Sequence, residues 1–335
     1  MAGLSEVAEA IKSSEERIKS IAERFRKNNS HEIGGALDGE LFVPVKSDKI
    51  DYSVCAVDGG LISERFHGSD MLVGKAVAVL FEYSGSKFSS CRYLPQKFPP
   101  CVVDARLGLD ERESQVYSSL FRLGMEIKTA IDAVKRFSPE VLLFDGSLLP
   151  LPSDMPAKES AIYPEYNKVL ALYAELYETC KGRCTLIGVI KDTRSRRLVS
   201  ALGIADEKMS DSYFANFLLR RGERTCIFPY AKEDTPATAE LKKFGRVCCF
   251  YLKPSETDLP LRIEFVDDGD AAGRVPAIIN SLSSISENYA YPAALIEADL
   301  CAAMDPLEME KVKSELSAML GGPLRPLRRN ARPFR

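Results

Sequence analysis

The sequence predicts an α/β protein: a mixed β-sheet core flanked by helices, with additional helical segments at the N- and C-terminal ends. Two observations predict this class. Three strand-like runs follow an N-terminal helical segment, with a hairpin signal between two of them, and helical and strand-like segments then alternate. The chain has 335 residues, of which 45% are hydrophobic and 28% are charged. This composition is typical of a soluble chain that forms one large domain or two modest ones.

The first elements are a helix and three strands. Apolar residues at helical spacing on a charged background predict a helix over residues 4–28. Apolar and β-branched runs predict strands over 52–58, 71–83 and 88–94. Gly59-Gly60 is a turn signal after the first strand, and Ser84-Gly85-Ser86 is short enough to close a hairpin. We therefore expect antiparallel pairing in this part of the chain.

Helix and strand alternate from residue 110 onwards. Apolar residues three and four apart predict a long amphipathic helix over 110–137, and a strand follows at 140–145. A second helix and strand are predicted at 158–181 and 184–190. Three antiparallel strands followed by this alternation is the element order of the ribonuclease-H-like fold. Since its first and fourth strands are neighbours, we expect the strand at 52–58 to lie beside the one at 140–145.

The second half is less regular. Strands are predicted at 226–228, 247–252 and 261–266, and helices at 210–221, 271–285, 293–304 and 306–320. We divide the chain into an N-terminal helical segment (1–48), a core domain (49–305), and a C-terminal helix with an arginine-rich tail (306–335). The tail from Pro323 to Arg335 has five arginines and no acidic residue. It is either a local basic surface or a solvated end of the chain.

Composition and motifs exclude several classes of protein. No run of about 18 apolar residues indicates a membrane span, and the polar N-terminus is unlike a secretory signal. Most of the nine cysteines lie in apolar runs, which favours a reduced, cytoplasmic protein. Phosphate-loop, dinucleotide-binding and Gly-x-Ser-x-Gly motifs are absent. The net charge of −3 argues mildly against a nucleic-acid binder.

Three carboxylates are the first candidates for chemistry. Asp58 and Asp145 each follow an apolar strand and precede a glycine, so their side chains can face a cleft where the backbone leaves the core. Glu126 borders the apolar stripe of the helix over 110–137. Carboxylates on neighbouring elements are what a divalent metal needs for phosphoryl transfer. The alternatives are Asp-Gly turns that cap backbone N–H groups, and an intrahelical ion pair of Glu126 with Arg122 or Lys128.

Basic residues follow the predicted strand at 184–190. Lys191 comes directly after it, and a cation there could offset charge on a phosphate. Arg194, Arg196 and Arg197 come next, and their guanidinium groups suit contacts with a nucleic-acid backbone. The alternative for Lys191 is an ordinary surface lysine at the end of a strand.

Six short segments together resemble the NurA nucleases, in the family's order and with its approximate spacing from about residue 50 to about 305. They are Ala56–Gly60, the helix with Arg122 and Glu126, Leu143–Leu148, Gly188–Asp192, Ser210-Asp211 and Tyr291–Asp299. The resemblance implies a manganese-dependent nuclease, with magnesium as an alternative metal. It also implies 5′-to-3′ exonuclease and single-strand endonuclease activity in DNA-end resection and double-strand-break repair. The implied partners are DNA, a second copy in a homodimer, and the hexameric HerA translocase, an ATPase.

The resemblance also assigns roles to residues. Asp58, Glu126 and Asp145 match the family's metal-binding carboxylates, and Lys191 matches its active-site lysine. Tyr291 matches the tyrosine of its C-terminal motif, where we expect it to contact substrate by stacking on bases. The family usually ends this motif with Ala-His, whereas this chain has Ala298-Asp299. Aspartate can ligate manganese through oxygen, so Asp299 is a fourth candidate ligand.

Two other functions stay open at this point. A non-catalytic DNA-binding scaffold with the same fold is favoured by the Asp299 departure, and would bind DNA without cleaving it. A metal-dependent phosphatase or nucleotidase is favoured by the acidic net charge, and would hydrolyse small phosphoesters without needing a polymer.

Overall fold

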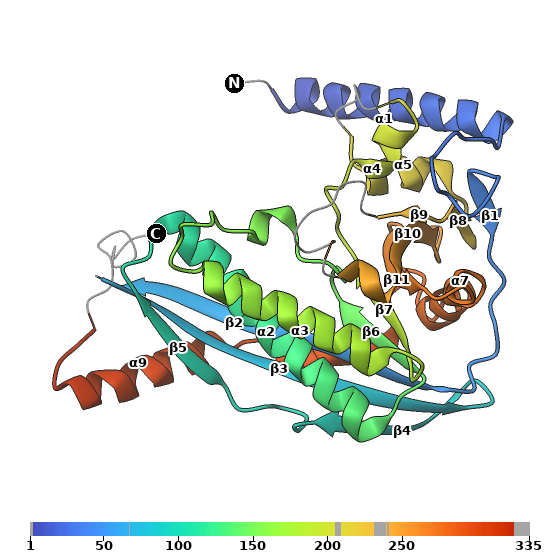
Figure 1. Ribbon diagram of the computed structural model, residues 1–335. Helices are drawn as coiled ribbons and strands as arrows, with labels where there is room; N and C mark the ends of the chain where they lie inside the picture. The colour runs from blue at the N-terminus through green and yellow to red at the C-terminus, as the bar shows by residue number, and fades with distance from the viewer. Residues whose placement is uncertain (1–2, 67, 205–208, 231–238, 240, 325–335) are drawn as a thin grey trace.

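A mixed sheet of 11 strands runs through the computed structural model, which describes residues 3–66, 68–204, 209–230, 239 and 241–324 (Figure 1). Its spine is the antiparallel pair β2 (Ser53–Phe66) and β3 (Ser69–Ser84). β4 (Lys87–Leu94) pairs with the C-terminal half of β3, and β5 (Val102–Leu107) pairs with its N-terminal half. The predicted hairpin is confirmed, with Gly85 and Ser86 at φ of 59° and 64° in its turn.

The expectation that the first strand ends at Asp58 is wrong. β2 continues for eight residues past it, and Gly59 and Gly60 pair with Ala76 and Lys75 of β3. Neither glycine has the positive φ of a turn. They are needed for close packing instead: a Cβ at Gly59 would lie 2.8 Å from Cγ of Glu126, and one at Gly60 would lie 2.0 Å from the carbonyl oxygen of Ala302.

The alternating part of the chain confirms the predicted topology. Helix α2 (Glu111–Phe137) is capped by Asp110, and β6 (Val141–Asp145), α3 (Tyr163–Cys180) and β7 (Thr185–Ile190) follow. α3 begins later than predicted, with a proline in its first turn. β6 is parallel to both β2 and β7, so five strands lie in the order β7-β6-β2-β3-β4. This is the ribonuclease-H-like arrangement, in which the first and fourth strands along the chain, here β2 and β6, are adjacent.

The remaining strands extend the sheet beyond β7. β11 (Leu261–Asp267) pairs with β7, β10 (Arg246–Lys253) with β11, and the short β8 (Glu223–Thr225) and β9 (Phe228–Pro229) with β10. β1 (Phe42–Pro44) completes this edge by pairing with β8. The helical elements of this half are α4 (Arg197–Ala201), α5 (Asp211–Leu218), η2 (Lys242–Phe244), α7 (Ala271–Ser283), α8 (Ala293–Ala302) and α9 (Pro306–Leu320), and η1 (Pro152–Asp154) precedes α3. β1, β5, β8 and α4 are not predicted from the sequence, and the strand predicted at 226–228 falls between β8 and β9, where only Phe228 belongs to a strand.

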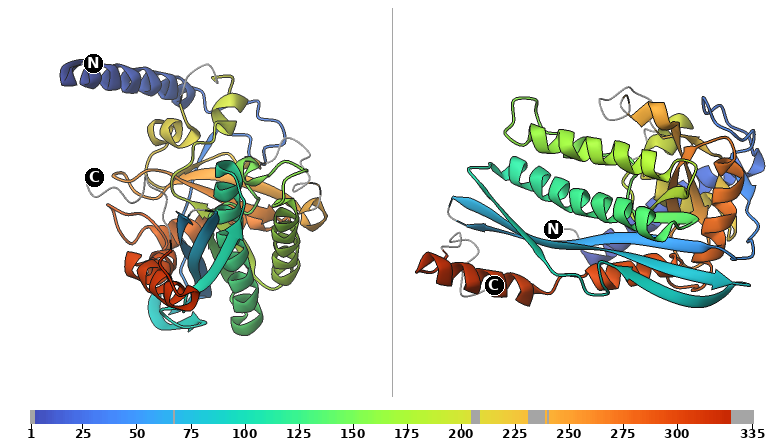
Figure 2. Two further views of the ribbon diagram at one scale, coloured as in Figure 1. Left: turned by 90° about the vertical axis from the view of Figure 1, so that its left-hand side faces the viewer. Right: turned by 60° about the horizontal axis from the view of Figure 1, so that its bottom comes forward.

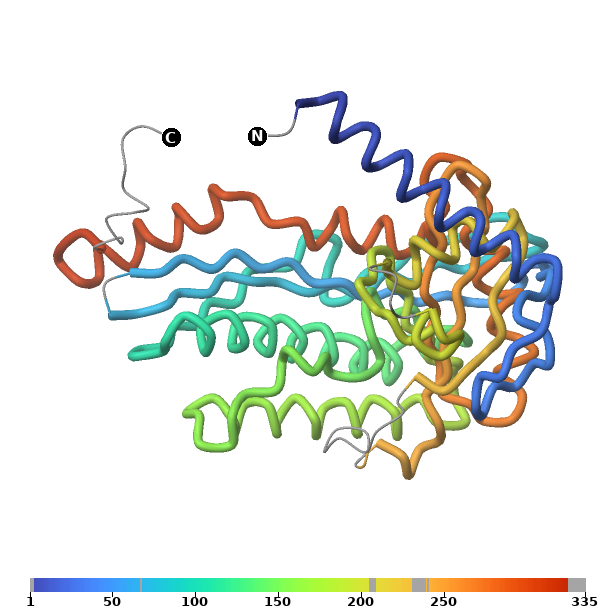
Figure 3. The backbone as a smooth tube through the Cα atoms, turned by 90° about the horizontal axis from the view of Figure 1, so that it is seen from above, coloured from blue at the N-terminus to red at the C-terminus, as the bar shows by residue number. Residues whose placement is uncertain are grey.

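The sheet separates two apolar cores. Seen from above, α8 and α9 lie on one side of β2 and β3, and α2 and then α3 lie on the other (Figure 3). Along β2, Cys55 and Val57 face the core under α2 and α3, while Val54 and Ala56 face the core under α7 and α8. This alternation is what a strand buried on both faces requires. It also decides which face each functional side chain occupies.

The two terminal helices pack differently. α1 (Leu4–Lys27) contacts α5 through its C-terminal half, where Ile18 and Ile21 are buried, and its N-terminal half projects from the body (Figure 2). α9 packs along β2 and β3 through Met309 and the ion pairs Lys75–Glu308 and Lys313–Glu64. Arg325 and the rest of the arginine-rich tail lie outside the described residues. None of the described helices is long and apolar enough to cross a membrane.

Candidate active site

Asp58 and Asp145 lie side by side on neighbouring strands. Val57 of β2 is level with Phe144 of β6 in the parallel register, so the next residues of the two strands are the two aspartates. Both lie in phase with the residues that face the core under α7 and α8. Asp58 is 6% exposed, and its Oδ1 accepts a hydrogen bond from the backbone N–H of Gly59 at 2.7 Å. Asp145 is the last residue of β6 and is partly exposed.

Glu126 approaches the aspartates from α2. It is 1% exposed, and its carboxylate lies over Gly59, where a Cβ would be 2.8 Å from Oε1. Oε1 accepts a hydrogen bond from Nη1 of Arg122 at 2.9 Å, so the intrahelical pair is formed. Oε2 is buried and has no hydrogen-bond partner among the described residues. One oxygen of this carboxylate is therefore available to a ligand.

Lys191 and Tyr291 both contact Asp145. Nζ of Lys191 lies 3.2 Å from Oδ2 of Asp145, and the hydroxyl of Tyr291 donates to Oδ1 at 3.1 Å. The ammonium also lies 4.3 Å from the centroid of the Tyr291 ring. Burial lowers the pKa of Lys191, but the charge and hydrogen bond of Asp145 raise it by more than burial lowers it. The pKa of Lys191 therefore lies above its ordinary value. Lys191 is therefore a cation here.

The expectation that Tyr291 stacks on bases does not fit its position. The residue is 2% exposed, so its ring has no free face for a base. Burial raises the pKa of its hydroxyl well above the usual value, so the group stays a neutral hydrogen-bond donor to Asp145. Tyr291 orients a carboxylate instead of offering an aromatic surface.

Asp299 lies on α8, which packs against β2. It is exposed, unlike Asp58 and Glu126, yet its charge and a hydrogen bond contribute to raising the pKa of Asp58. It also acts on Lys191 from a distance. The residue that departs from the family pattern thus faces the same carboxylates as the matching residues do.

The carboxylates carry negative charge that the protein does not fully compensate. Burial and the charges of Asp145 and Asp299 raise the pKa of Asp58 to about 7. Burial raises the pKa of Glu126 to about 8, against the lowering effect of Arg122. Such shifts mean that the ionised forms are disfavoured unless a further cation is present.

These residues fit a divalent cation. In the part of the chain that is described, no three acidic, histidine or cysteine side chains are already gathered closely enough to hold a metal ion, and Arg122 and Lys191 each take one carboxylate. The donor set is nevertheless all oxygen, as Mg²⁺ and Mn²⁺ prefer, and the buried Oε2 of Glu126 has no hydrogen-bond partner among the described residues, so it is free to bind a cation.

The raised pKa of Asp58 predicts a pH-dependent cost to the metal-free fold. Between the ordinary value of 3.8 and about 7, the folded chain keeps this proton while the unfolded chain releases it. Stability therefore falls as the pH rises through this window. Asp58→Asn removes the ionisation, so in chelator at pH 8 we expect it to raise the free energy of unfolding by about 1–3 kcal/mol. This gain is smaller than the full difference in pKa implies, because neighbouring carboxylates share the titration.

The measurement is urea unfolding with chelator at pH 8 and at pH 5. At pH 5 the gain from Asp58→Asn should shrink, because most of the wild-type carboxyl is then protonated in the folded chain. An equal gain at both pH values would show that Asp58 is not the group that titrates.

A cleft of about 760 Å³ opens beside Asp145. It is lined by Arg122 of α2, by residues of the loop after β6, and by Arg194, Arg196 and Arg197 from the segment after β7. The predicted arginines are thus brought to the same cleft as Asp145. Sequence reasoning missed Arg262, which also lines it, because a charged residue alternating with apolar ones along a strand is typical of a solvated face.

Comparison with protein families gives a match over most of the chain. The model of the NurA domain matches residues 52–302, which is most of the chain and includes Asp58, Glu126, Asp145, Lys191 and Asp299. No protein among the curated sequences matches this chain.

Solved structures of the same family share the fold. The NurA nuclease from Sulfolobus solfataricus is 15% identical with a TM-score of 0.59, and the match covers 95% of this chain and 98% of that one. A NurA structure with manganese is 9% identical (TM-score 0.58; 94% and 98% covered). A NurA structure bound to dAMP and manganese is 11% identical (TM-score 0.59; 94% and 96% covered).

Proposed function

Because the chain belongs to the NurA family of nucleases, we propose that it hydrolyses DNA phosphodiester bonds with the help of a divalent metal ion, Mn²⁺ or Mg²⁺. The observation that carries this proposal is the adjacency of Asp58 and Asp145 on neighbouring strands, with Glu126 packed over Gly59 next to Asp58 and Lys191 in contact with Asp145. The manganese and dAMP in related structures support it.

Asp58, Glu126 and Asp145 would hold the metal, with Asp299 as a further oxygen ligand. A bound divalent ion would supply Lewis-acid stabilisation of the phosphate and a more acidic bound water. The chain's own contribution is a set of oxygens fixed by buried elements. Tyr291 holds Oδ1 of Asp145, and Gly59 lets Glu126 approach β2. A site held this way loses little freedom when it binds its ligand.

Lys191 and the arginines would act on the nucleic acid. The ammonium of Lys191 lies beside the carboxylate of Asp145, where it can offset negative charge that develops on a phosphate. Arg194 and Arg196 are exposed along the cleft, so they can contact the DNA backbone, with Arg197 partly buried behind them. The cleft thus brings exposed arginines to the neighbourhood of Asp145.

The biological setting follows from the family resemblance and is proposed with it. We propose 5′-to-3′ exonuclease and single-strand endonuclease activity in DNA-end resection and break repair, in the cytoplasm, as a homodimer with a HerA-type translocase. We also propose that residues 49–305 form the catalytic unit. Outside this unit, the helix at 4–28 and the tail at 323–335 are the segments proposed to help dock the translocase, whereas β1 and α9 pack on the sheet.

The test is a cleavage assay on single-stranded and duplex DNA with Mn²⁺, with Mg²⁺ and with chelator, beside a small phosphoester. We expect DNA to be cut with metal only, and the small ester to be left intact. DNA binding without cleavage would favour the scaffold, for which the aspartate in place of the family's histidine at position 299 is the supporting observation. Hydrolysis of the small ester alone would favour a phosphatase.

The ends of the chain give a separate prediction about the translocase. Leu4, Val7 and Ile11 form an apolar stripe on the projecting half of α1 and are 91%, 46% and 55% exposed. We expect Leu4→Ser with Ile11→Ser, and a chain ending at Gly322, each to weaken co-purification with a HerA-type protein several-fold and leave DNA cleavage unchanged. Undiminished binding by both variants would remove these segments from the interface.

A further inference from the structure

A buried ion pair on β11 lies outside the proposed metal ligands. Arg262 and Glu264 are two residues apart, so their side chains lie on the same face of the sheet, and they are 4% and 0% exposed. Nη2 of Arg262 lies 2.9 Å from Oε1 of Glu264. Charged residues are almost never this deeply buried without a specific set of partners. Their other contacts reach the two loops that follow β6 and β7.

Glu264 holds the loop after β6. Its Oε2 accepts hydrogen bonds from the hydroxyl of Ser147 at 2.8 Å and from the backbone N–H of Leu148 at 2.9 Å. Gly188 lets the loop lie close to the sheet. It pairs with Glu264 on one side and with Phe144 on the other. A Cβ at Gly188 would lie 2.6 Å from the carbonyl oxygen of Gly146. The loop that begins at Asp145 therefore crosses over Gly188 to reach Glu264.

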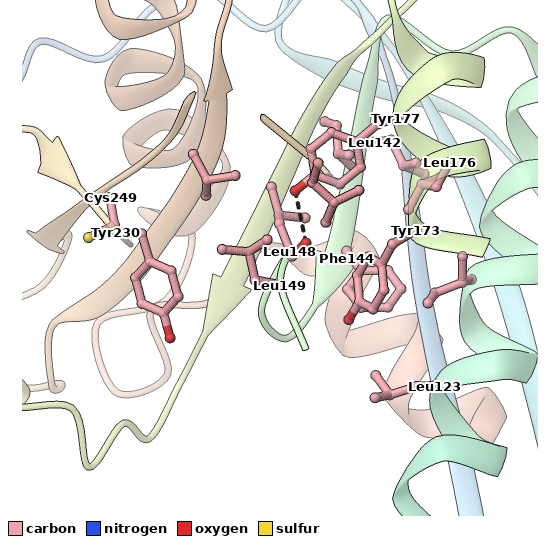
Figure 4. Packing of buried hydrophobic residues seen from close by; sticks show 14 of the residues in the cluster. Leu123, Leu142, Phe144, Leu148, Leu149, Tyr173, Leu176, Tyr177, Tyr230 and Cys249 are labelled. Carbon is pink, nitrogen blue, oxygen red and sulfur yellow. Dashed lines mark hydrogen bonds between the residues drawn. The ribbon is translucent and has the colours of Figure 1, made fainter. Parts of the chain in front are cut away.

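The same loop is held from the opposite side by α3. Figure 4 shows Leu148 close to Tyr177, with the hydrogen bond between them drawn, and Leu149 next to it between Tyr230 and Tyr173. The Tyr177 hydroxyl donates to the carbonyl oxygen of Leu148 at 2.8 Å, and Tyr173 donates to that of Ser147 at 3.2 Å. α3 thus binds the carbonyls of the loop, while Glu264 binds its N–H and hydroxyl groups.

Arg262 holds the segment after β7. Its Nη1 donates to the hydroxyl of Thr193 at 2.9 Å, two residues past Lys191. Its guanidinium also lies 4.9 Å from the centroid of the Tyr230 ring, and Arg197 lies 4.3 Å from the same ring. The pair therefore connects the residues after Asp145 to those after Lys191 through one rigid strand.

We propose that Arg262 and Glu264 are positioning residues, which fix the loops after β6 and β7 relative to each other and so keep Asp145 and Lys191 in register at the active site. Stability alone does not explain why a buried ion pair stands here, because apolar side chains of similar volume are often as stabilising. The contacts that the pair makes to both loops explain it instead. This inference rests on the proposed function, since it assigns the pair to that site.

The test compares variants that differ in the loop contacts. Arg262→Met with Glu264→Leu keeps the volume and leaves no buried charge unpaired, so it should fold. Arg262→Met with Glu264→Gln keeps an oxygen acceptor for Leu148 and likewise leaves no buried charge unpaired. The matched control is Asp38→Ala, because Asp38 likewise accepts from a buried arginine, Arg224, and from a backbone N–H, that of Ile227, but away from the cleft.

Two readouts are measured on the full chain: amide hydrogen exchange at Leu148, and the split between kcat and KM with Mn²⁺ and single-stranded DNA. For Arg262→Met with Glu264→Leu we expect exchange at least about 10-fold faster, because the N–H loses its acceptor. We expect kcat to fall about 10–100-fold with KM changed less than about 3-fold, the size typical when support around a metal site is removed. Arg262→Met with Glu264→Gln should recover slow exchange at Leu148 and part of the kcat, since it restores the contact to the loop after β6 but not the contact to Thr193. Asp38→Ala should change neither the exchange at Leu148 nor kcat.

Asp145→Asn is measured in parallel to separate the two claims. If it cleaves DNA like the wild type, the assignment of Asp145 to the active site fails, and the exchange at Leu148 still decides whether the pair holds the loop. If the wild-type chain itself does not cleave DNA with metal, the proposed function fails, and the exchange at Leu148 decides in the same way. If Asp145→Asn is inactive while Arg262→Met with Glu264→Leu keeps wild-type kcat and slow exchange, the positioning role is overturned. A loss of kcat equal to that of Asp38→Ala overturns it as well, since any loss of buried charge would then have the same effect.

Discussion

Replacing Asp145 by asparagine is expected to lower kcat for metal-dependent cleavage of single-stranded DNA by about 10³-fold or more, and Asp58→Asn is expected to do the same. A metal contributes several kcal/mol of charge stabilisation in phosphoryl transfer, and about 4 kcal/mol corresponds to about 10³-fold in rate. The amide keeps the shape of the side chain but removes the charge that would bind the ion. Rates with saturating Mn²⁺ are the measurement.

Asp132→Asn is the matched control. Asp132 lies on α2, the helix that carries Glu126, but its side chain is exposed on the opposite side to the buried face. The same chemical change there should leave kcat within about 2-fold, because an exposed charge remote from the site is screened by solvent. Wild-type cleavage by either Asp58→Asn or Asp145→Asn would refute the site.

Replacing Gly60 by alanine is expected to destabilise the fold by about 3 kcal/mol or more, at the upper end of what overpacking costs. The new Cβ would lie 2.0 Å from the carbonyl oxygen of Ala302 and 2.8 Å from Cγ of Met304. The first of these atoms is backbone at the end of α8, so the helix that carries Asp299 has to move. Urea unfolding measures the loss, and metal-dependent cleavage should fall with it.

Gly124→Ala tests whether the effect is steric. Gly124 lies in the interior of α2, and a Cβ there would meet nothing within 4 Å. Alanine should therefore stabilise the chain by about 0.5–1 kcal/mol, through the usual gain of alanine over glycine in a helix. If Gly60→Ala were as stable as the wild type, the close approach of α8 to β2 would be wrong.

The sequence predicts the part of the fold that depends on element order. Three antiparallel strands followed by alternating helix and strand place Asp58 beside Asp145, and the register of β2 and β6 confirms it. The extent of β2 could not be predicted in this way. Gly59-Gly60 has the composition of a turn, and only the packing of Glu126 and Ala302 against the strand explains why glycines stand there.

The chemical types of the site residues were predictable, but their contacts were not. Carboxylates at strand ends and a lysine after a strand can be found from spacing alone. The burial of Tyr291 depends on how α8 packs on β2 and β6, and the paths from Arg262 and Glu264 to two loops depend on β11 lying beside β7. Such contacts join segments more than 60 residues apart, so no local pattern marks them.

The most direct test of the account is Mn²⁺ binding measured by isothermal titration calorimetry on the metal-free full chain. The account predicts a saturable binding event in the wild type that Asp58→Asn, Glu126→Gln and Asp145→Asn each weaken at least about 10-fold, whereas Asp132→Asn leaves it unchanged. Binding of the same affinity in all four variants would contradict the claim that these carboxylates form the metal centre.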